Sequence, residues 1–410
     1  MNFELFIAKR IIGSKSYKSS VSAPIIKIGI TAITIGMVVM LVAIATGLGL
    51  QQKIRDKVVA FNGHIVVSNY DNNASNESIV PISINQDFYP EFKTVEGVKY
   101  IQPVAAKFGL IRTETNVEGV VLKGVASDYN WSYFETFLVE GSLPNFNDTM
   151  SNSVLISSIV ANRLNLKSGD KFQMVFGEDL QKVPRIRSFT ISGVFSSGFE
   201  ELDKTFILGD IRHIQRLNRW EKEDVGSFEI FIDDYSKLDE KTTEIYESIP
   251  SLLNARKVSD KYYSVFEWIK IFDNNVYGII GIMILVAGIN MITALLVLIL
   301  ERTQMIGILK ALGSSNFSIR KIFLTNASYL VGLGLLWGNI IGIGLLLIQK
   351  YFKIIPLNPD TYYVNEAPVY LSFDYILLLN IGTFIACMLL LVIPSVIISK
   401  ITPVKAIRFD

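Results

Sequence analysis

The sequence predicts a membrane protein with four transmembrane α-helices and a large extracytoplasmic α+β domain between helices 1 and 2. Two observations predict this fold class. Four long stretches contain no charged residue, and each exceeds the about 20 residues that cross a hydrocarbon core as a helix. Between the first two of these stretches, the pattern changes to short alternating or β-branched runs with helical segments among them.

The four charge-free stretches are residues 28–50, 274–300, 322–349 and 375–399. Buried helices of soluble proteins rarely continue so far without a charge, so we assign each stretch as a transmembrane helix. The first stretch is longer than the roughly 7–15 apolar residues of a signal peptide. We therefore interpret it as an uncleaved anchor.

Lysine and arginine residues near the spans predict the orientation. They are concentrated in the N-terminal arm 1–27, the loop 301–321 and the tail 400–410, whereas the loop 350–374 has two lysines and three acidic residues. Positively charged segments stay on the cytoplasmic side, so both termini and the loop 301–321 are predicted to be cytoplasmic. Residues 51–270 and the loop 350–374 then lie outside the cytoplasm.

The formal charge of +1 hides a division along the chain. Residues 51–270 hold 25 basic and 31 acidic residues, and the rest of the chain holds 14 and 7. The basic excess therefore follows the membrane topology, and it gives no case for a nucleic-acid partner.

The region 51–270 is predicted to fold as a soluble α+β domain, long enough to bury its own core. Its strand-like runs are 63–70, 98–104, 119–125, 172–176, 188–195 and 228–233, and its helical segments are 157–166, 209–220 and 238–249.

No catalytic or metal-binding residue set is predicted in this domain. His64 and His213 are isolated, without a second ligand at metal-binding spacing, and we expect them at the surface or at helix caps. Glu200, Glu201 and Asp203 raise the question of a hydrolase, but no serine in a nucleophile elbow and no nearby histidine accompany them. We interpret these carboxylates as part of a solvated loop.

The spans contain no Asp, Glu, Lys, Arg or His, which argues against an ion-coupled transporter or a proton pump. Asn290 and Asn339 are mid-span polar residues, and we expect them to form interhelical hydrogen bonds. Gly334, Gly338 and Gly342 form a repeated small-x-x-x-small pattern that lets a neighbouring helix approach closely. That neighbour is either another span of the same chain or a partner subunit.

The stretch "GILKALGSS", residues 307–315, has the composition of a phosphate-binding loop but not its spacing. Five residues separate Gly307 from Gly313, Ser314 stands where the motif needs lysine, and an apolar span precedes it instead of a strand. We therefore expect this chain to bind no nucleotide.

The same loop predicts a short helix with one apolar face. Met305, Ile306, Leu309 and Leu312 recur at helical spacing. This face needs a cover, either the lipid interface or a groove on a cytosolic protein. Composition does not choose between them.

Order and motifs together resemble the MacB/FtsX/LolC-type permeases of ABC transporters. The layout of one span, a large external domain and three spans is theirs, and "ERTQMIGILKALGSSNFSIRKIFL" (301–324) is similar to their coupling-helix signature. The end "ITPVKAIRFD" (401–410) and the stretch "VLISSIVANRLNLKSGDKFQMVF" (154–176) also resemble family segments. "SGVFSSGFEELDKTFIL" (192–208) and "GLGLQQKIRDKVVAFNGHIVV" (47–67) are similar to the LolC/LolE branch.

This resemblance implies a permease subunit of the bacterial inner membrane that works with a separate cytosolic ABC ATPase subunit. ATP and Mg²⁺ would be bound by that ATPase, and this chain would hold no cofactor. The implied ATPase-coupling residues are Glu301, Arg302, Met305, Ile306, Leu309, Lys310 and Leu312. Gln304 departs from the family, which usually has glutamate at this position.

The branch further implies a second permease subunit, in a homodimer or a heterodimer. Its cargo would be lipoproteins, taken from the outer leaflet and released toward the outer membrane, with a periplasmic lipoprotein carrier as a further partner. Two alternatives remain from the wider family. One is an FtsX-like signalling subunit that controls a cell-wall hydrolase, and the other is a MacB-like efflux permease for peptides or drugs.

Overall fold

The structure, a computed structural model, describes residues 3–13, 23–72, 76–113, 116–147, 149–177 and 184–401. It confirms the predicted fold class, because four helices are long and apolar enough to cross a membrane and an α+β domain follows the first. The chain divides into two compact units. The membrane unit comprises the residues up to Leu50, Ile269–Pro356 and the residues from Glu366; the outer unit comprises Gln51–Trp268 and Leu357–Asn365.

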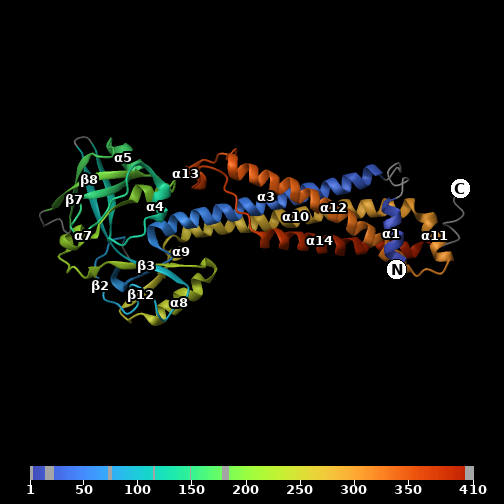
Figure 1. The fold of residues 1–410 in the computed structure, drawn as a ribbon, viewed down its shortest axis with the longest axis horizontal. Helices are drawn as coiled ribbons and strands as arrows, with labels where there is room; N and C mark the ends of the chain where they lie inside the picture. Colours follow the sequence, from blue (N-terminus) through green and yellow to red (C-terminus); the bar gives the residue numbers. More distant parts are fainter. Residues whose placement is uncertain are drawn as a thin grey trace. The chain divides into compact units, whose positions relative to one another are not determined.

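Four long helices form the membrane unit (Figure 1). They are α3 (Ala23–Asn62), α10 (Tyr263–Glu301), α12 (Asn316–Phe352) and α14 (Phe373–Ser395). Each contains one predicted span. Their facing sides share one apolar cluster, and many of their other large apolar side chains are exposed, as expected for helices whose solvent is lipid.

Three shorter helices lie at one end of this bundle (Figure 1). They are α1 (Phe3–Gly13), α11 (Thr303–Ala311) and α15 (Ile397–Lys400). Ala8 of α1 packs against Ile322 of α12, and Glu4 accepts a hydrogen bond from the Ser318 hydroxyl at 2.8 Å. Most of the stretch 401–410 lies outside the described residues.

The outer unit is built around a ten-stranded sheet, and its long strand β3 takes part in two groups of paired strands. The strands are β1 (Ile65–Asn69), β3 (Val98–Arg112), β4 (Val117–Val125), β5 (Leu138–Gly141), β6 (Ser153–Ser157), β7 (Lys171–Phe176), β8 (Arg185–Phe195), β9 (Phe206–Asp210), β11 (Ser227–Ile232) and β12 (Leu253–Lys257). The first half of β3 continues the order β12–β1–β11–β3. Its second half pairs with both β4 and β7 and closes a ring, β3–β4–β9–β6–β8–β7.

Most pairings in this sheet are antiparallel, but β4–β9 and β6–β8 are parallel. A separate two-stranded sheet joins β2 (Ile82–Ser83) and β10 (Asp224–Val225). The short helical elements are η1 (Tyr70–Asn72), α4 (Ser132–Phe137), α5 (Ser158–Leu164), α6 (Glu200–Thr205), α7 (Ile211–Asn218), η2 (Tyr235–Lys237), α8 (Leu238–Ser248), α9 (Val258–Lys261) and α13 (Pro359–Tyr362). All six predicted strand runs and all three predicted helical segments contain the expected element.

Local sequence sets the ends of the outer-unit helices. Ser157 caps α5 by accepting a hydrogen bond from the Val160 N–H, and Asp210 caps α7 in the same way. Asn165 and Arg219, which follow these two helices, adopt left-handed backbone conformations that end them.

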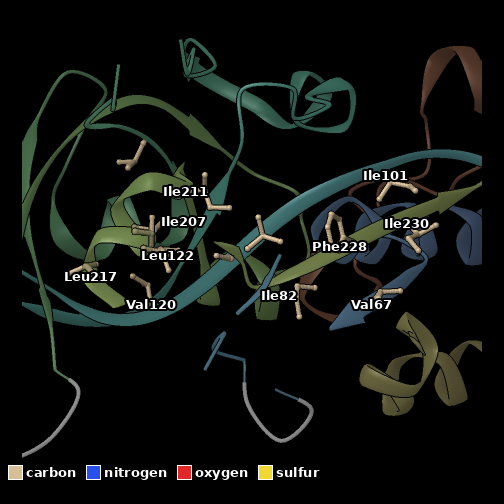
Figure 2. Close-up of a cluster of buried hydrophobic side chains, with 14 of the residues drawn as sticks. Val67, Ile82, Ile101, Val120, Leu122, Ile207, Ile211, Leu217, Phe228 and Ile230 are labelled. Atoms are coloured by element: carbon tan, nitrogen blue, oxygen red, sulfur yellow. The ribbon is translucent and has the colours of Figure 1, made fainter. Parts of the chain in front are cut away.

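The outer-unit core lies between the sheet and its helices (Figure 2). Side chains that alternate along the strands enter it, among them Val120 and Leu122 of β4 and Phe228 and Ile230 of β11. Ile211, at the start of α7, packs against the same cluster. The alternating pattern that predicted these strands therefore also identifies their buried side.

Two sequence expectations for the outer unit are wrong. His213 is buried, where its ring packs edge-on against Phe189 and its Nε2 lies 2.9 Å from the Ser151 carbonyl oxygen. Asp203, expected in a solvated loop with Glu200 and Glu201, lies buried in α6. Helical spacing explains both differences, because each residue falls on the side of a short helix that faces the core.

A buried ion pair joins the end of α3 to the sheet. The Lys123 ammonium lies 2.7 Å from Glu229 Oε1 and 2.8 Å from Oε2, and both side chains are almost fully buried. Lys123 also donates to the Phe61 carbonyl oxygen at 2.7 Å, which is one of the free carbonyls in the last turn of α3. Gln102 donates to the same carboxylate at 3.0 Å.

Removing one member of this pair should destabilise the outer unit strongly. Lys123→Met leaves the Glu229 carboxylate buried without its cation, and we expect a loss of about 3–5 kcal/mol in the free energy of unfolding. The double variant Lys123→Met/Glu229→Leu carries no charge at these two positions, so it should be more stable than Lys123→Met alone. Denaturant unfolding of the three chains measures this, and a double variant no more stable than the single one would contradict it.

Candidate functional site

The predicted cytoplasmic loop, residues 301–321, connects α10 to α12 through the short helix α11. Glu301 is the last residue of α10, and Arg302 stands at the bend before α11. After α11, Gly313 has a φ of +89°, a left-handed conformation that suits glycine. Ser315 then caps α12 by accepting a hydrogen bond from the Ser318 N–H at 3.2 Å.

The predicted apolar face of α11 is mostly covered by the chain itself. Ile306 is fully buried, and Met305 and Leu309 are half-buried against Ala8 of α1 and Ile322 of α12. These three residues therefore lie in the core of the membrane unit. The sequence analysis expected lipid or a partner groove to cover this face, but α1 and α12 of the same chain cover these residues.

A different apolar surface of this connection is exposed. We call it the α11 patch. It consists of Ile308, Leu312 and Phe317, with exposed fractions of 48%, 79% and 76%. Of these three residues, the sequence pattern indicated only Leu312. The apolar residues here follow two helical faces, and periodicity alone does not show which face is covered by α1 and α12.

Lys310 is held within the membrane unit. Its ammonium group donates to the carbonyl oxygens of Ile398 at 2.8 Å and Ile401 at 2.6 Å, at the end of α15. A cation at this position stabilises the unpaired carbonyls of a helix C-terminus. Lys310, predicted to contact an ATPase, therefore ties α11 to the end of the fourth span.

The three glycines of the third span face α3 of the same chain. A Cβ atom added at Gly334, Gly338 or Gly342 would lie 2.7, 2.5 or 2.9 Å from atoms of Ile33, Met37 and Leu41, respectively. Partners and glycines both advance by four residues, so the two helices run parallel with α3 side chains seated over the glycine row. Of the two neighbours left open, the structure thus shows a span of the same chain.

The Asn339 side chain pairs with Asn380 across α12 and α14. The two amides exchange hydrogen bonds of 2.7 and 3.0 Å, and each also donates to a carbonyl oxygen of its own helix. The expectation of an interhelical bond is confirmed for Asn339. Asn290 instead donates to the Val286 carbonyl oxygen of its own helix at 2.8 Å.

Asp203 forms a polar cluster in the outer unit. It accepts hydrogen bonds from the Ser197 hydroxyl at 2.5 Å and from the Ser197 N–H at 3.1 Å. Burial raises the pKa of Asp203 to about 6, although these hydrogen bonds and the nearby Lys57 favour the charged form. Among the residues that the structure describes, no group of three or more His, Cys, Asp or Glu could hold a metal ion.

Gly338→Leu should force α3 and α12 apart, because the site of its Cβ atom is already within 2.5 Å of Met37. We expect a loss of about 1–3 kcal/mol in stability, the usual range for overpacking. Leucine forms helix better than glycine, so membrane insertion should persist. Gly344→Leu, on the same helix with open space around it, is the matched control. Thermal unfolding in detergent compares them, and equal midpoints would contradict the close α3–α12 contact.

Asp203 predicts a pH-dependent stability difference. Its folded pKa of about 6 exceeds the usual 3.8, so burying the ionised carboxylate costs stability above pH 6, and this cost disappears as the pH falls toward 4. Asp203→Asn carries no charge, so its stability relative to the original chain should improve between pH 4.5 and 7.5, by at most about 3 kcal/mol. Thermal unfolding across this range measures the difference, with Glu201→Gln as the control. A difference that does not change with pH would contradict the assignment.

Two protein-family models match this chain. Residues 28–240 match the model of the MacB-like periplasmic core domain, and residues 277–403 match that of the FtsX-like permease C-terminal family.

Relatives match nearly the whole chain. The lipoprotein-releasing system transmembrane protein LolC of Xylella fastidiosa is 22% identical, with 98% of this chain and 96% of that protein covered. LolE of Haemophilus influenzae is 20% identical, with 99% of each covered. The macrolide export ATP-binding/permease protein MacB of Bdellovibrio bacteriovorus is 25% identical over 92% of this chain and 58% of that protein.

Among solved structures, the periplasmic region of MacB from Actinobacillus actinomycetemcomitans matches 50% of this chain and 95% of that one, with 12% identity and a TM-score of 0.34. Together, the two family models cover the charge-free helices and most of the α+β domain. The chain therefore belongs to the MacB/FtsX-like permease family, and within it the chain is similar over nearly its whole length to LolC and LolE.

Proposed function

We propose that this chain is a permease subunit of an ABC transporter that releases lipoproteins from the outer leaflet of the bacterial inner membrane toward the outer membrane. The observation that carries this proposal is the similarity to LolC and LolE along 98% or more of this chain. Proteins of that name belong to a lipoprotein-releasing system. The lack of ionisable residues in the spans supports an energy source outside the membrane.

ATP hydrolysis in this proposal comes from a separate cytosolic ATPase subunit that docks on the α11 patch. Exposed apolar side chains at the end of a membrane bundle suit a groove on a partner protein, since burial there removes them from water. The basic residues flanking the spans support a cytoplasmic position for both termini and for the patch. The outer unit is then periplasmic.

A second permease subunit completes the proposed transporter, as a homodimer or a heterodimer. The Gly334–Gly342 row already packs on α3, so it is not the surface that would meet this subunit. Exposed apolar residues of α10, such as Ile282, Leu285 and Ile289, face away from the bundle core and contact either lipid or the second subunit.

Efflux of peptides or drugs is the second candidate function. It is favoured by the similarity to MacB of Bdellovibrio bacteriovorus, which covers 92% of this chain. MacB carries a macrolide-export name, whereas the LolC and LolE matches carry a lipoprotein-releasing one, so cargo distinguishes the two candidates. An FtsX-like signalling role would transport neither cargo.

Reconstitution tests the proposed function. The chain would be purified with the proteins that co-purify from its native membrane, and placed in vesicles that contain a fluorescent triacylated lipoprotein. We expect release of the lipoprotein from the vesicles only when Mg-ATP and the ATPase are both present. ATP-dependent loss of a macrolide from preloaded vesicles, without lipoprotein release, would favour the efflux candidate instead.

Leu312→Glu should weaken ATPase binding while the chain still folds. Leu312 is 79% exposed, so a charge there costs little in the free chain but much once a partner covers it. We expect at least about a tenfold loss in affinity, equivalent to about 1.4 kcal/mol. A pull-down titration from detergent measures this.

Leu252→Glu is the matched control for this test, because Leu252 is 75% exposed in the outer unit. It should bind the ATPase as the original chain does. Leu309→Glu is not a suitable variant, because Leu309 packs inside the membrane unit and a charge there would disturb the chain itself. Unchanged binding by Leu312→Glu would exclude docking on the α11 patch.

A further inference from the structure

Residues 357–365 stand apart from the chain around them. They belong to the outer unit, whereas the residues before them, to Pro356, and after them, from Glu366, belong to the membrane unit. The other two passages between the units run inside continuous helices, α3 and α10. The segment 357–365, by contrast, is joined to the rest of the outer unit only by non-covalent contacts.

Tyr363 provides the main contacts of this segment. Its ring stacks on Phe199, with centroids 4.5 Å apart and planes 13° from parallel, and meets Trp268 edge-on at 5.5 Å. The Lys57 ammonium of α3 donates to the Tyr363 carbonyl oxygen at 2.6 Å. The next residue, Val364, is buried, with 5% of its surface exposed.

The polar cluster around Asp203 builds the site on the outer unit that receives Tyr363, and we call this site the seat. Asp203 fixes Ser197, and the Ser197 hydroxyl in turn accepts a hydrogen bond from the Phe199 N–H at 3.0 Å. Gly198, between them, has a φ of +68°, and a Cβ atom there would lie 2.9 Å from Lys57 Nζ. The glycine therefore leaves the space through which Lys57 reaches Tyr363, and the buried carboxylate sets the position of the Phe199 ring.

The backbone of Tyr363 is strained in this seat. Its φ is +58°, a left-handed conformation that tyrosine rarely adopts. Such a conformation persists only while its surroundings hold it. The seat is small, with one ammonium-to-carbonyl hydrogen bond, one stacked ring and one buried valine as its central contacts, so a free segment would leave this conformation.

We propose that residues 357–365 form a releasable latch on the outer unit, held closed by the Lys57–Tyr363 hydrogen bond and the Phe199–Tyr363 stack. Opening the latch frees the loop between α12 and α14 from the outer unit without breaking a helix. The stretch "SSGFEELD" (196–203) then has a structural role, because it supplies the seat. The latch needs neither cargo nor ATPase, so it stands independently of the transport proposal.

Thiol accessibility in the full chain tests the latch. Cys387, the only cysteine, is first replaced by alanine. Val364→Cys then places a thiol within the latch, at a position that is buried while the latch is closed. Asn365→Cys, at the exposed neighbouring residue, is the reference for an accessible thiol. In detergent, maleimide should label Val364→Cys at least about tenfold more slowly than Asn365→Cys, since labelling of a buried thiol requires opening.

Variants of the contacts should then open the latch. Adding Lys57→Met or Tyr363→Ala to Val364→Cys should raise the labelling rate at least about fivefold, because each removes a contact that only the closed state makes. The matched controls are Lys53→Met, an exposed lysine one turn earlier in α3, and Tyr362→Ala, an exposed neighbour of Tyr363. These should leave the rate within about twofold.

Two results would overturn the latch. One is labelling of Val364→Cys as fast as Asn365→Cys, which means that the segment is not seated. The other is contact variants that label no faster than their controls. If Lys57→Met lowers the thermal unfolding midpoint of the chain, Phe199→Leu decides the outcome, since it keeps an apolar side chain at this buried position and removes the ring that stacks on Tyr363. Labelling at the control rate in Phe199→Leu would then also overturn the proposal.

Discussion

The buried ion pair of Lys123 and Glu229 is the constraint around which the end of α3 and the sheet of the outer unit are arranged. It binds the Phe61 carbonyl oxygen at the end of α3 and thereby fixes the point where that helix meets the sheet. One turn earlier on the same helix, Lys57 reaches Tyr363. The last two turns of α3 thus take part in both interactions. Phe61 accepts the hydrogen bond from Lys123, and Lys57 holds the proposed latch closed. A buried charge pair is well suited to fix the end of α3, because separating the two side chains would leave each charge in an apolar interior without its partner.

Within the membrane unit, packing follows the rules of a solvent that is itself apolar. Leucine gains little by leaving lipid for a neighbouring helix, so close contact and hydrogen bonds decide which helices meet. α12 makes both kinds of contact, close packing with one neighbouring helix and hydrogen bonds with another. Its glycine row receives side chains of α3, and its Asn339 exchanges hydrogen bonds with Asn380 of α14.

Sequence reasoning predicted the spans and the class of the outer domain, because both depend on composition and periodicity over many residues. It predicted close helix packing at Gly338, but not the partner, since a pattern on one helix does not name its neighbour. For Met305 and Leu309, the expected cover was lipid or a partner protein, because helical periodicity does not show that α1 of the same chain packs against them. Asp203 was missed for a related reason. A carboxylate beside two other acidic residues looks solvated until tertiary contacts bury it.

The ring of strands in the outer unit has a consequence for how the protein is made. β1 pairs with β11 and β12, more than 150 residues later in the chain, and two pairs in the ring are parallel, which requires long crossover connections. Contacts between distant residues form slowly, because the intervening chain must first be brought together. β1 therefore has no partner strand until β11 and β12 have crossed the membrane. The nascent chain is most exposed to aggregation and proteolysis during that interval, before α10 is made.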